Sequence, residues 1–153
     1  LNYQPKHSIR CVLFMNEENG ANGAKVYAKY SSEQNIKHTL ALESDRGGFS
    51  PRGFSIDAVP EIEESFKTFI SSFQDLFKPY YVHYFELGYS GVDINFLKDQ
   101  GIPLLGFVPD SQRYFDHHHA PNDNIDAVNK RELELGAATI SSMIYLVVKH
   151  ISK

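Results

Sequence analysis

Short apolar runs alternate with helical segments along the sequence, and this alternation is the feature that most limits which fold the chain can adopt. Each run is long enough for one strand, and a segment with helical character follows it. Strands that alternate with helices are typical of α/β domains in which helices pack on a parallel sheet. The sequence therefore predicts one α/β domain with a mixed, mainly parallel sheet flanked by helices. The predicted strands are residues 10–16, 38–44, 80–87 and 102–110.

Two longer segments have apolar residues at helical spacing. We expect the first helix to begin near Pro60, where nearby glutamates suit the positive end of its dipole, and to end at Pro79. The last helix is expected to begin after Asn129, with Glu132 completing a capping box. The first should pack in the core, and the last should cover the sheet. Their apolar faces are Ile62, Phe66, Phe69, Phe73 and Leu76 in the first, and Leu133, Ala137, Ile140, Ile144, Val147 and Ile151 in the last.

Glycine-rich segments separate the predicted elements. Residues 45–54, DRGGFSPRGF, combine closely spaced glycines with a proline, so they predict a loop without regular structure. Residues 19–30 predict a glycine-rich turn that leads into a short helix, and residues 91–101 predict a loop followed by another short helix. The loops therefore follow directly on the strand ends, where ligand-binding residues of α/β proteins are commonly found.

Charge and cysteine content exclude several classes of partner. The chain has 15 Lys and Arg against 19 Asp and Glu, with a net charge of −4 and no basic run. Nucleic acid is not an expected partner, because binding a phosphate backbone needs clustered basic side chains. The apolar runs are far shorter than the roughly 20 residues that cross a bilayer, so we expect no membrane partner. Cys11 is the only cysteine, which excludes an internal disulfide and a thiolate zinc site.

Carboxylates follow the ends of several predicted strands. Glu17 and Glu18 come directly after the first run, Asp45 after the second and Asp110 after the fourth. Adjacent side chains diverge, so one glutamate of the pair can hold a metal ion while the other faces a water molecule. The alternative is structural, because exposed glutamates are common and Asp45 beside Gly47 is typical of a turn.

A histidine run is the second candidate feature. His117, His118 and His119 lie in a polar loop, and consecutive side chains cannot all face one ion. Asp123 follows His119 at a spacing that would let its carboxylate orient the His119 imidazole. The alternative for the whole histidine run is an exposed loop that binds no metal. Asp93, in GYSGVDINF, is interpreted as a packing or capping residue. Glutamate, aspartate and histidine without cysteine suit a hydrolytic zinc site, in which a spare glutamate can act as general base.

In their order and spacing, five sequence blocks resemble the zinc-dependent aminopeptidases and carboxypeptidases of peptidase family M28. The blocks are NEENGANG, ALESDRGG, GYSGVDINFL, GIP and YFDHHHAPND, and the resemblance extends from about Ile9 to the last helix. It implies the fold of a zinc exopeptidase and a peptide substrate that is cleaved next to a free terminus. It also implies two zinc ions in a complete active site.

The resemblance assigns roles to individual residues. Glu17 matches the general base, while Glu18 and His119 match ligands of one metal and Asp45 matches a ligand of the other. Asp123 matches the aspartate that follows the histidine ligand. Phe49, Phe54 and Tyr89 lie in loops that are candidates for the substrate pocket, and they are candidates for that reason alone.

The family's first two ligands, a histidine in an HxD motif and a bridging aspartate, come before the NEE block. Before Asn16 this sequence has only His7, without that motif. Residues 1–153 therefore resemble the C-terminal part of a single zinc-peptidase catalytic domain, with a sheet incomplete at its N-terminal side. We expect such a chain to bind metal weakly, to be inactive alone, and to form a homodimer through the uncovered sheet edge.

Two other functions remain open alternatives. A non-catalytic interaction domain with the M28 fold would have lost metal ligands, whereas Glu17, Glu18, Asp45 and His119 are all present. A single-zinc enzyme similar to glutaminyl cyclase would depart from the NEE block, and the sequence shows no such departure. By resemblance, the expected location is periplasmic or secreted.

Overall fold

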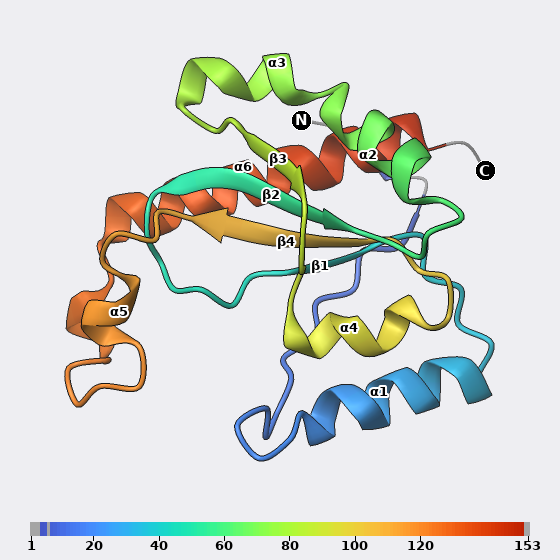
Figure 1. The fold of residues 1–153 in the computed structure, drawn as a ribbon, viewed down its shortest axis with the longest axis horizontal. Helices are drawn as coiled ribbons and strands as arrows, with labels where there is room; N and C mark the ends of the chain where they lie inside the picture. The colour runs from blue at the N-terminus through green and yellow to red at the C-terminus, as the bar shows by residue number, and fades with distance from the viewer. Residues whose placement is uncertain (1–3, 6, 152–153) are drawn as a thin grey trace. The chain divides into compact units, whose positions relative to one another are not determined.

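The computed structural model describes residues 4–5 and 7–151, and a four-stranded sheet with the order β1-β4-β2-β3 lies within them (Figure 1). β1 pairs with β4 and β2 pairs with β3 in parallel. The Ser50 carbonyl accepts a hydrogen bond from the Asp110 N–H, and the Ser55 hydroxyl donates one to the Gly106 carbonyl. Because the earlier residue on the β2 side pairs with the later residue on the β4 side, these two strands run in opposite directions. The predicted mixed, mainly parallel sheet is confirmed. Its strands are β1 (Ala41–Glu43), β2 (Pro51–Asp57), β3 (Tyr84–Leu87) and β4 (Leu104–Pro109).

The chain divides into two compact units, each built from segments that are distant in the sequence. The first unit contains the residues up to Val12, Gly47–Pro51 and the chain from Pro109 onward. The second contains Leu13–Arg46 and Arg52–Val108. The helices of the second unit are α1 (Asn22–Glu33), α2 (Glu63–Ser71), α3 (Gln74–Phe77), the 3₁₀ helix η1 (Lys78–Tyr80) and α4 (Val92–Lys98). Those of the first are α5 (Tyr114–His117), the 3₁₀ helix η2 (Ile125–Ala127) and α6 (Lys130–His150).

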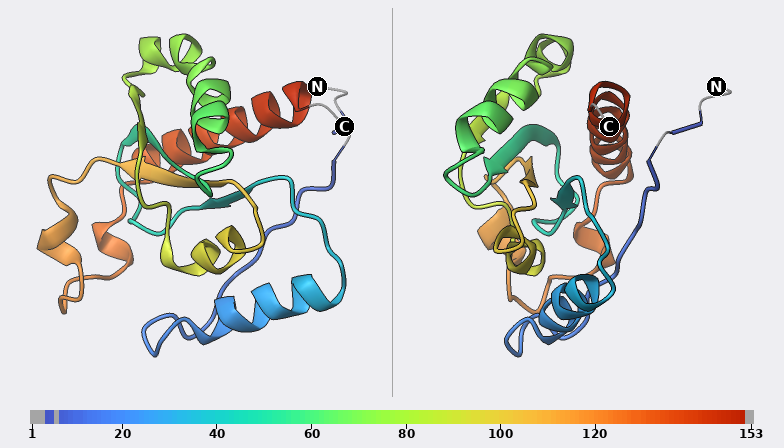
Figure 2. Two further views of the ribbon diagram at one scale, coloured as in Figure 1. Left: turned by 45° about the vertical axis from the view of Figure 1, so that its right-hand side comes forward. Right: turned by 90° about the vertical axis from the view of Figure 1, so that its right-hand side faces the viewer.

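Helices cover both faces of the sheet within the second unit. On one face, the fully buried Phe54 of β2 contacts three phenylalanine rings at centroid distances of 5.9–6.1 Å, and α2 and α3 lie on this side (Figure 2). On the other face, α1 and α4 lie side by side and pack against β1 and β4. Burial of these apolar side chains is the main force that holds the unit together. The three rings are Phe77, Phe85 and Phe107, and the second cluster contains Ala28, Ile94, Leu97 and Leu104.

Strand β2 occupies much of the segment predicted to be an irregular loop, so that prediction is wrong for residues 51–54. Pro51 is the first residue of the strand, where a missing backbone donor is tolerated. Gly53 has φ +151°, and a Cβ there would collide with the Tyr84 carbonyl of β3. The glycine that indicated a loop is therefore required for close pairing of two strands.

The predicted strand at residues 10–16 is absent from the part of the chain that the structure describes. The segment still alternates, because Val12 and Phe14 are half-buried while Leu13 and Met15 are 94% and 76% exposed. A strand is stabilised by a hydrogen-bonded neighbour, and no described strand pairs with this segment. Periodicity alone indicated the local conformation but not its partner.

The predicted helix after Pro60 is interrupted at residues 72–73, so that α2 and α3 follow one another. Phe66 and Phe73 are buried as predicted, whereas Leu76, also predicted on the apolar face, is 59% exposed. The buried residues Phe66, Ile70, Phe73 and Phe77 keep helical spacing across the interruption. The periodicity therefore identified the apolar stripe but placed part of it one residue too early.

Helix α6 begins where the sequence indicated, since the Asn129 side chain accepts hydrogen bonds from the N–H groups of Arg131 and Glu132. Val147 is buried as predicted, but the other buried residues, Gly136, Thr139 and Met143, lie outside the predicted face, and Leu133 is 51% exposed. Apolar residues occur on several sides of this helix, so the periodicity identified the helix but not the correct stripe. The expectation that α6 covers the sheet stays a prediction.

Candidate functional site

The two adjacent glutamates lie in a tight turn that leads into α1. The Gly20 N–H donates to the Glu17 carbonyl at 2.9 Å, and Gly20 has φ +98°, a conformation that favours glycine. Gly23 packs on the backbone of Met15, where a Cβ would lie 2.5 Å from the carbonyl oxygen. The glycines of NEENGANG therefore form this turn, which leaves Glu17 half-buried and Glu18 exposed.

Glu43 is a structural carboxylate that the sequence analysis did not identify. It is the last residue of β1 and is 9% exposed, and its Oε2 accepts the Ile94 N–H at 2.9 Å. It therefore caps the first turn of α4, which has no side-chain cap of its own. Burial raises the pKa of Glu43, and the charges of Asp45 and Asp93 raise it further. The sequence signal was a short strand ending in an acidic residue, but its partner was 51 residues away.

Negative charge is crowded around Asp45 in the second unit. Burial and the Asp45 charge raise the pKa of Asp93, and its Oδ1 is buried without a hydrogen-bond partner. Burial, followed by the charges of Glu43 and Glu17, raises the pKa of Tyr89, whose side chain is 51% exposed. Like charges at short range disfavour ionisation, and a bound cation relieves this repulsion.

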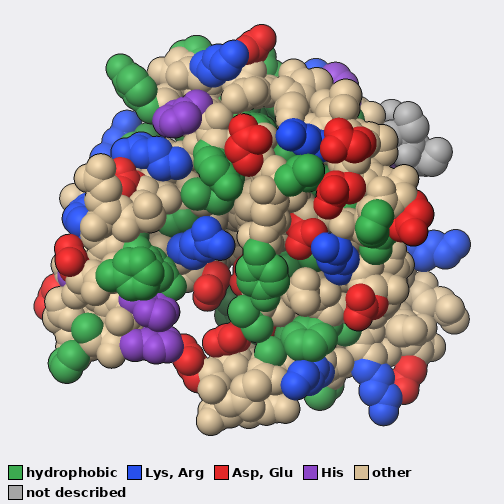
Figure 3. All heavy atoms as spheres, in the orientation of Figure 1, with side chains coloured by type: hydrophobic (Ala, Val, Ile, Leu, Met, Phe, Trp, Pro, Cys, Tyr) green, Lys and Arg blue, Asp and Glu red, His purple; other side chains and the backbone are tan. Residues whose placement is uncertain are grey.

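The histidine run lies in the first unit at the end of α5, and Figure 3 shows histidine side chains gathered over that helix. The rings of His118 and His119 stack at a centroid distance of 4.0 Å, and His118 also packs on Tyr114 at 4.7 Å. His117 faces the Phe49 ring at 6.2 Å, and its Nδ1 is buried without a hydrogen-bond partner. The three imidazoles therefore have different surroundings, as expected for consecutive residues.

His119 and Asp123 are both exposed and lie on a chain of short turns. His119 has φ +55°, in the left-handed region, which is uncommon for a residue with a side chain. The Ala120 N–H donates to His117, and the Asp123 N–H donates to Ala120, each at 2.9 Å. The orientation of His119 by the Asp123 carboxylate stays a prediction.

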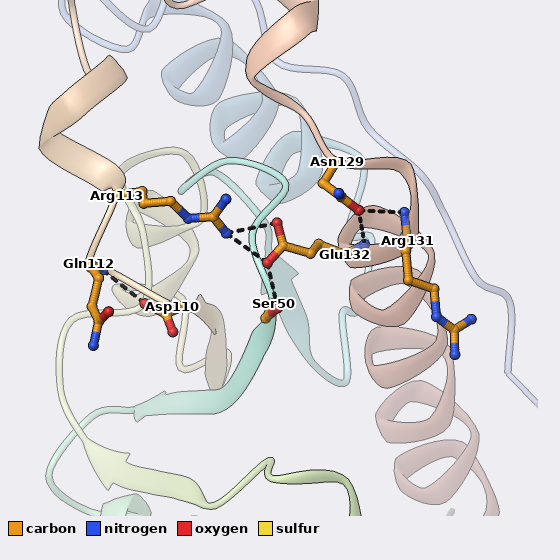
Figure 4. Close-up of polar contacts among 7 residues, drawn as sticks. All are labelled: Ser50, Asp110, Gln112, Arg113, Asn129, Arg131 and Glu132. Atoms are coloured by element: carbon orange, nitrogen blue, oxygen red, sulfur yellow. Dashed lines mark hydrogen bonds and ion pairs between the residues drawn. The ribbon is translucent and has the colours of Figure 1, made fainter.

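A polar network next to α5 was not anticipated. Figure 4 shows Glu132 of α6 pointing toward Arg113 and Ser50. Arg113 Nη2 lies 2.7 and 2.8 Å from the two Glu132 carboxylate oxygens, and the Ser50 hydroxyl donates to Oε1 at 2.6 Å. The hydrogen bonds that Arg113 and Ser50 donate hold the pKa of Glu132 below its usual range, and donating to the Glu132 carboxylate raises the pKa of Arg113. Glu132 therefore binds other segments instead of completing the predicted capping box.

The aromatic candidates for a substrate pocket differ in their surroundings. Phe54 is fully buried in the phenylalanine cluster of the core, so it is a packing residue and we no longer consider it for a pocket. Phe49 is 6% exposed and lies under the Arg113 guanidinium at 4.9 Å. Tyr89 is the exposed member and remains a candidate. Asp110 accepts the Gln112 N–H at 2.9 Å, a contact within its own turn.

The candidate ligands Glu18, Asp45 and His119 have side chains of the types that bind zinc. Glu18 and Asp45 belong to the second unit and His119 to the first. The unpaired Asp93 oxygen near Asp45 is a further sign that the acidic cluster suits a cation. No group of three His, Cys, Asp or Glu side chains that could hold a metal ion occurs among residues 4–5 and 7–151. The donor chemistry of these candidate ligands nevertheless fits zinc.

The charge distribution on the surface and the character of the helices bear on which partners the chain can bind. On the face in Figure 3, Lys and Arg side chains are interspersed with Asp and Glu. None of the helices in the described part of the chain has the length and apolar character needed to cross a bilayer.

Comparisons with known proteins identify the family. Carboxypeptidase Q from Rattus norvegicus is 29% identical over 147 residues, which cover 96% of this chain and 30% of the relative, and that from Homo sapiens is 27% identical with the same coverage. The crystal structure of a peptidase M28 precursor from Shewanella amazonensis SB2B matches 100% of this chain and 34% of its own, with a TM-score of 0.82 and 28% identity. The chain thus spans about a third of these relatives' length. Peptidase family M28 matches residues 1–144, and the chain therefore belongs to this family.

Proposed function

We propose that the chain provides the C-terminal part of the catalytic domain of a zinc-dependent exopeptidase. The observation that supports this most directly is the match of residues 1–144 to peptidase family M28, in a sequence that retains the glutamate pair, Asp45 and His119. The crowded carboxylates around Asp45 support the same proposal, because unbalanced negative charge suits a metal site. The substrate is a peptide, cleaved next to a free terminus.

Glu18, Asp45 and His119 would hold the zinc ions, two in a complete site. Bound zinc supplies an activated water and polarises the scissile carbonyl. Glu17 differs from Glu18 in being half-buried, and its backbone is fixed by the turn before α1. Its carboxylate would accept the proton of the water and later return it to the leaving amine. Tyr89 is the remaining candidate for contact with the substrate.

The relatives are about three times as long as this chain, so activity of the whole protein is part of the proposal. A catalytic zinc needs about three protein ligands, and the family's first two ligands come before the NEE block, where this sequence has only His7 without the HxD motif. We therefore propose that this chain alone binds zinc weakly and hydrolyses peptides slowly or not at all. A second copy of the chain is the proposed partner at the sheet edge, and a periplasmic or secreted location is proposed from family resemblance.

Zinc content tests the ligand assignment. We would measure zinc per chain by elemental analysis after dialysis for the wild type, His119→Ala and His83→Ala. The last variant removes an exposed imidazole of the second unit, away from the histidine run, and serves as a matched control. Zinc that is lost only with His119 supports the assignment. Equal zinc in all three proteins contradicts it, and no zinc in any of them would mean that the ligands that precede the NEE block in the family are needed to organise the site.

Peptide hydrolysis by the longer protein tests the base. Glu17→Gln should abolish turnover and preserve zinc content, whereas Glu18→Gln should lose zinc. If Glu17→Gln retained wild-type turnover, Glu17 would not be the base.

A further inference from the structure

The segment that contains the candidate ligand His119 is fixed at its start by the network already described. Arg113 directly precedes α5, and Glu132 lies in the first turn of α6. The Glu132 carboxylate accepts hydrogen bonds from the Arg113 guanidinium and from the Ser50 hydroxyl, at 2.6–2.8 Å. It therefore joins three segments of the first unit that are separated by 19 and 82 residues in the sequence.

The Arg113 guanidinium is held on a second side by an aromatic ring. It lies 4.9 Å from the centroid of Phe49, which is 6% exposed. The same ring faces His117 at 6.2 Å with an interplanar angle of 31°. A planar guanidinium that is both stacked and paired with a carboxylate has little remaining freedom. Phe49 thus contacts both the residue before α5 and the first histidine of the run.

The backbone at His119 needs such support. Its φ of +55° is in the left-handed region, where a side chain costs free energy unless the surroundings fix the conformation. His118 transmits the position of α5, because its ring stacks on Tyr114 at 4.7 Å and on His119 at 4.0 Å. The turn is closed by the Ala120 N–H, which donates to the His117 carbonyl.

We propose that Arg113 and Glu132 are positioning residues that hold Tyr114–Asp123, the histidine segment, so that the candidate ligand His119 keeps its left-handed conformation. The claim that this conformation serves metal binding rests on the proposed function. Neither residue touches the metal or the reacting atoms. The negative charge of Glu132 also suits its place in the first turn of α6, and the low pKa of this group keeps it ionised.

Hydrogen–deuterium exchange of the metal-free protein tests the positioning. We compare the wild type with Glu132→Gln and with Glu134→Gln, an identical change in the same helix, where Glu134 pairs with Lys130 at 3.9 Å on the surface. In Glu132→Gln the amides of His118–Ala120 should exchange about tenfold faster or more, while those of residues 139–147 stay protected. Wild-type exchange at His118–Ala120 in Glu132→Gln would overturn the proposal.

Zinc affinity, measured by calorimetry with the metal alone, separates positioning from simple stability. Loss of groups that orient a ligand typically weakens metal binding 10–100-fold, so Glu132→Gln should weaken it by about tenfold and Glu134→Gln should leave it unchanged. The double variant with Arg113→Gln and Glu132→Gln should bind zinc no more weakly than either single variant, because both changes remove the same Arg113–Glu132 ion pair. Unchanged affinity in Glu132→Gln, while His119→Ala weakens binding, would overturn the positioning role. Unchanged affinity in His119→Ala would contradict the proposed function instead, and the exchange data would still decide whether the network fixes the segment.

Discussion

Replacing Gly91 with alanine should displace Glu43 from the start of α4. Gly91 precedes α4 with φ +142° and ψ 157°, a combination that is essentially restricted to glycine. A Cβ at this position would overlap the Glu43 carboxyl group. Because Glu43 is buried and accepts the Ile94 N–H at 2.9 Å, it cannot move without losing that hydrogen bond.

The expected cost has two parts. A side chain in this backbone conformation costs about 1–3 kcal/mol. The second part is the Ile94 N–H left buried without its acceptor, which costs a further 1–3 kcal/mol or so. Gly91→Ala should therefore lower the free energy of unfolding by about 2–6 kcal/mol.

Urea unfolding at 25 °C measures this change, with Gly101→Ala as the matched control. Gly101 also has a positive φ, +76°, but nothing lies within 4 Å of its Cβ position, so only a backbone cost of about 1–2 kcal/mol is expected. Adding Glu43→Ala to Gly91→Ala should cost less than the sum of the two single changes, because the overlap is removed. Equal losses in Gly91→Ala and Gly101→Ala would refute the reasoning.

Two further predictions concern the core and the network. Phe54→Ala should lower the free energy of unfolding by about 3–5 kcal/mol, because the ring is fully buried. Leu76→Ala, at a 59% exposed position, should change it by less than about 0.5 kcal/mol. Urea unfolding measures both changes. The pKa of Glu132 lies below its usual value of 4.5, so its stabilising effect is present above that pH and is lost as the pH falls through the folded pKa. The difference in unfolding free energy between wild type and Glu132→Gln should thus be largest near pH 7 and shrink as the pH falls below 4.5, and a constant difference from pH 7 to pH 3 would contradict it.

The sequence predicted elements whose evidence is local. β1, β3 and β4, the Asn129 cap and the turn before α1 all depend on neighbouring residues, and each occurs in the structure. β2 was missed because Pro51 and Gly53 are typical of loops, and only the adjacent β3 shows why glycine is needed. Residues 10–16 have the pattern of a strand but lack a paired neighbour among the described strands.

The residues around the candidate site also differ in whether the evidence for them is local in the sequence. The glutamate pair, Asp45 and His119 were found because each belongs to a short sequence block. Glu43 and Glu132 were not assigned correctly, because their partners are 51 residues away in one case and up to 82 in the other. Single-sequence patterns therefore indicate candidate residues that lie in contiguous blocks more readily than residues whose partners are distant in the sequence.

The extended segment at residues 10–16 has a consequence for handling the protein. Cys11–Met15 contains no charge and no proline, and its most exposed side chains are Leu13 and Met15. Segments of this kind promote intermolecular β-association, which net charge elsewhere on the molecule does not prevent. A lysine at position 13, where the side chain is 94% exposed, should therefore act as a gatekeeper against this association without disturbing the packed core.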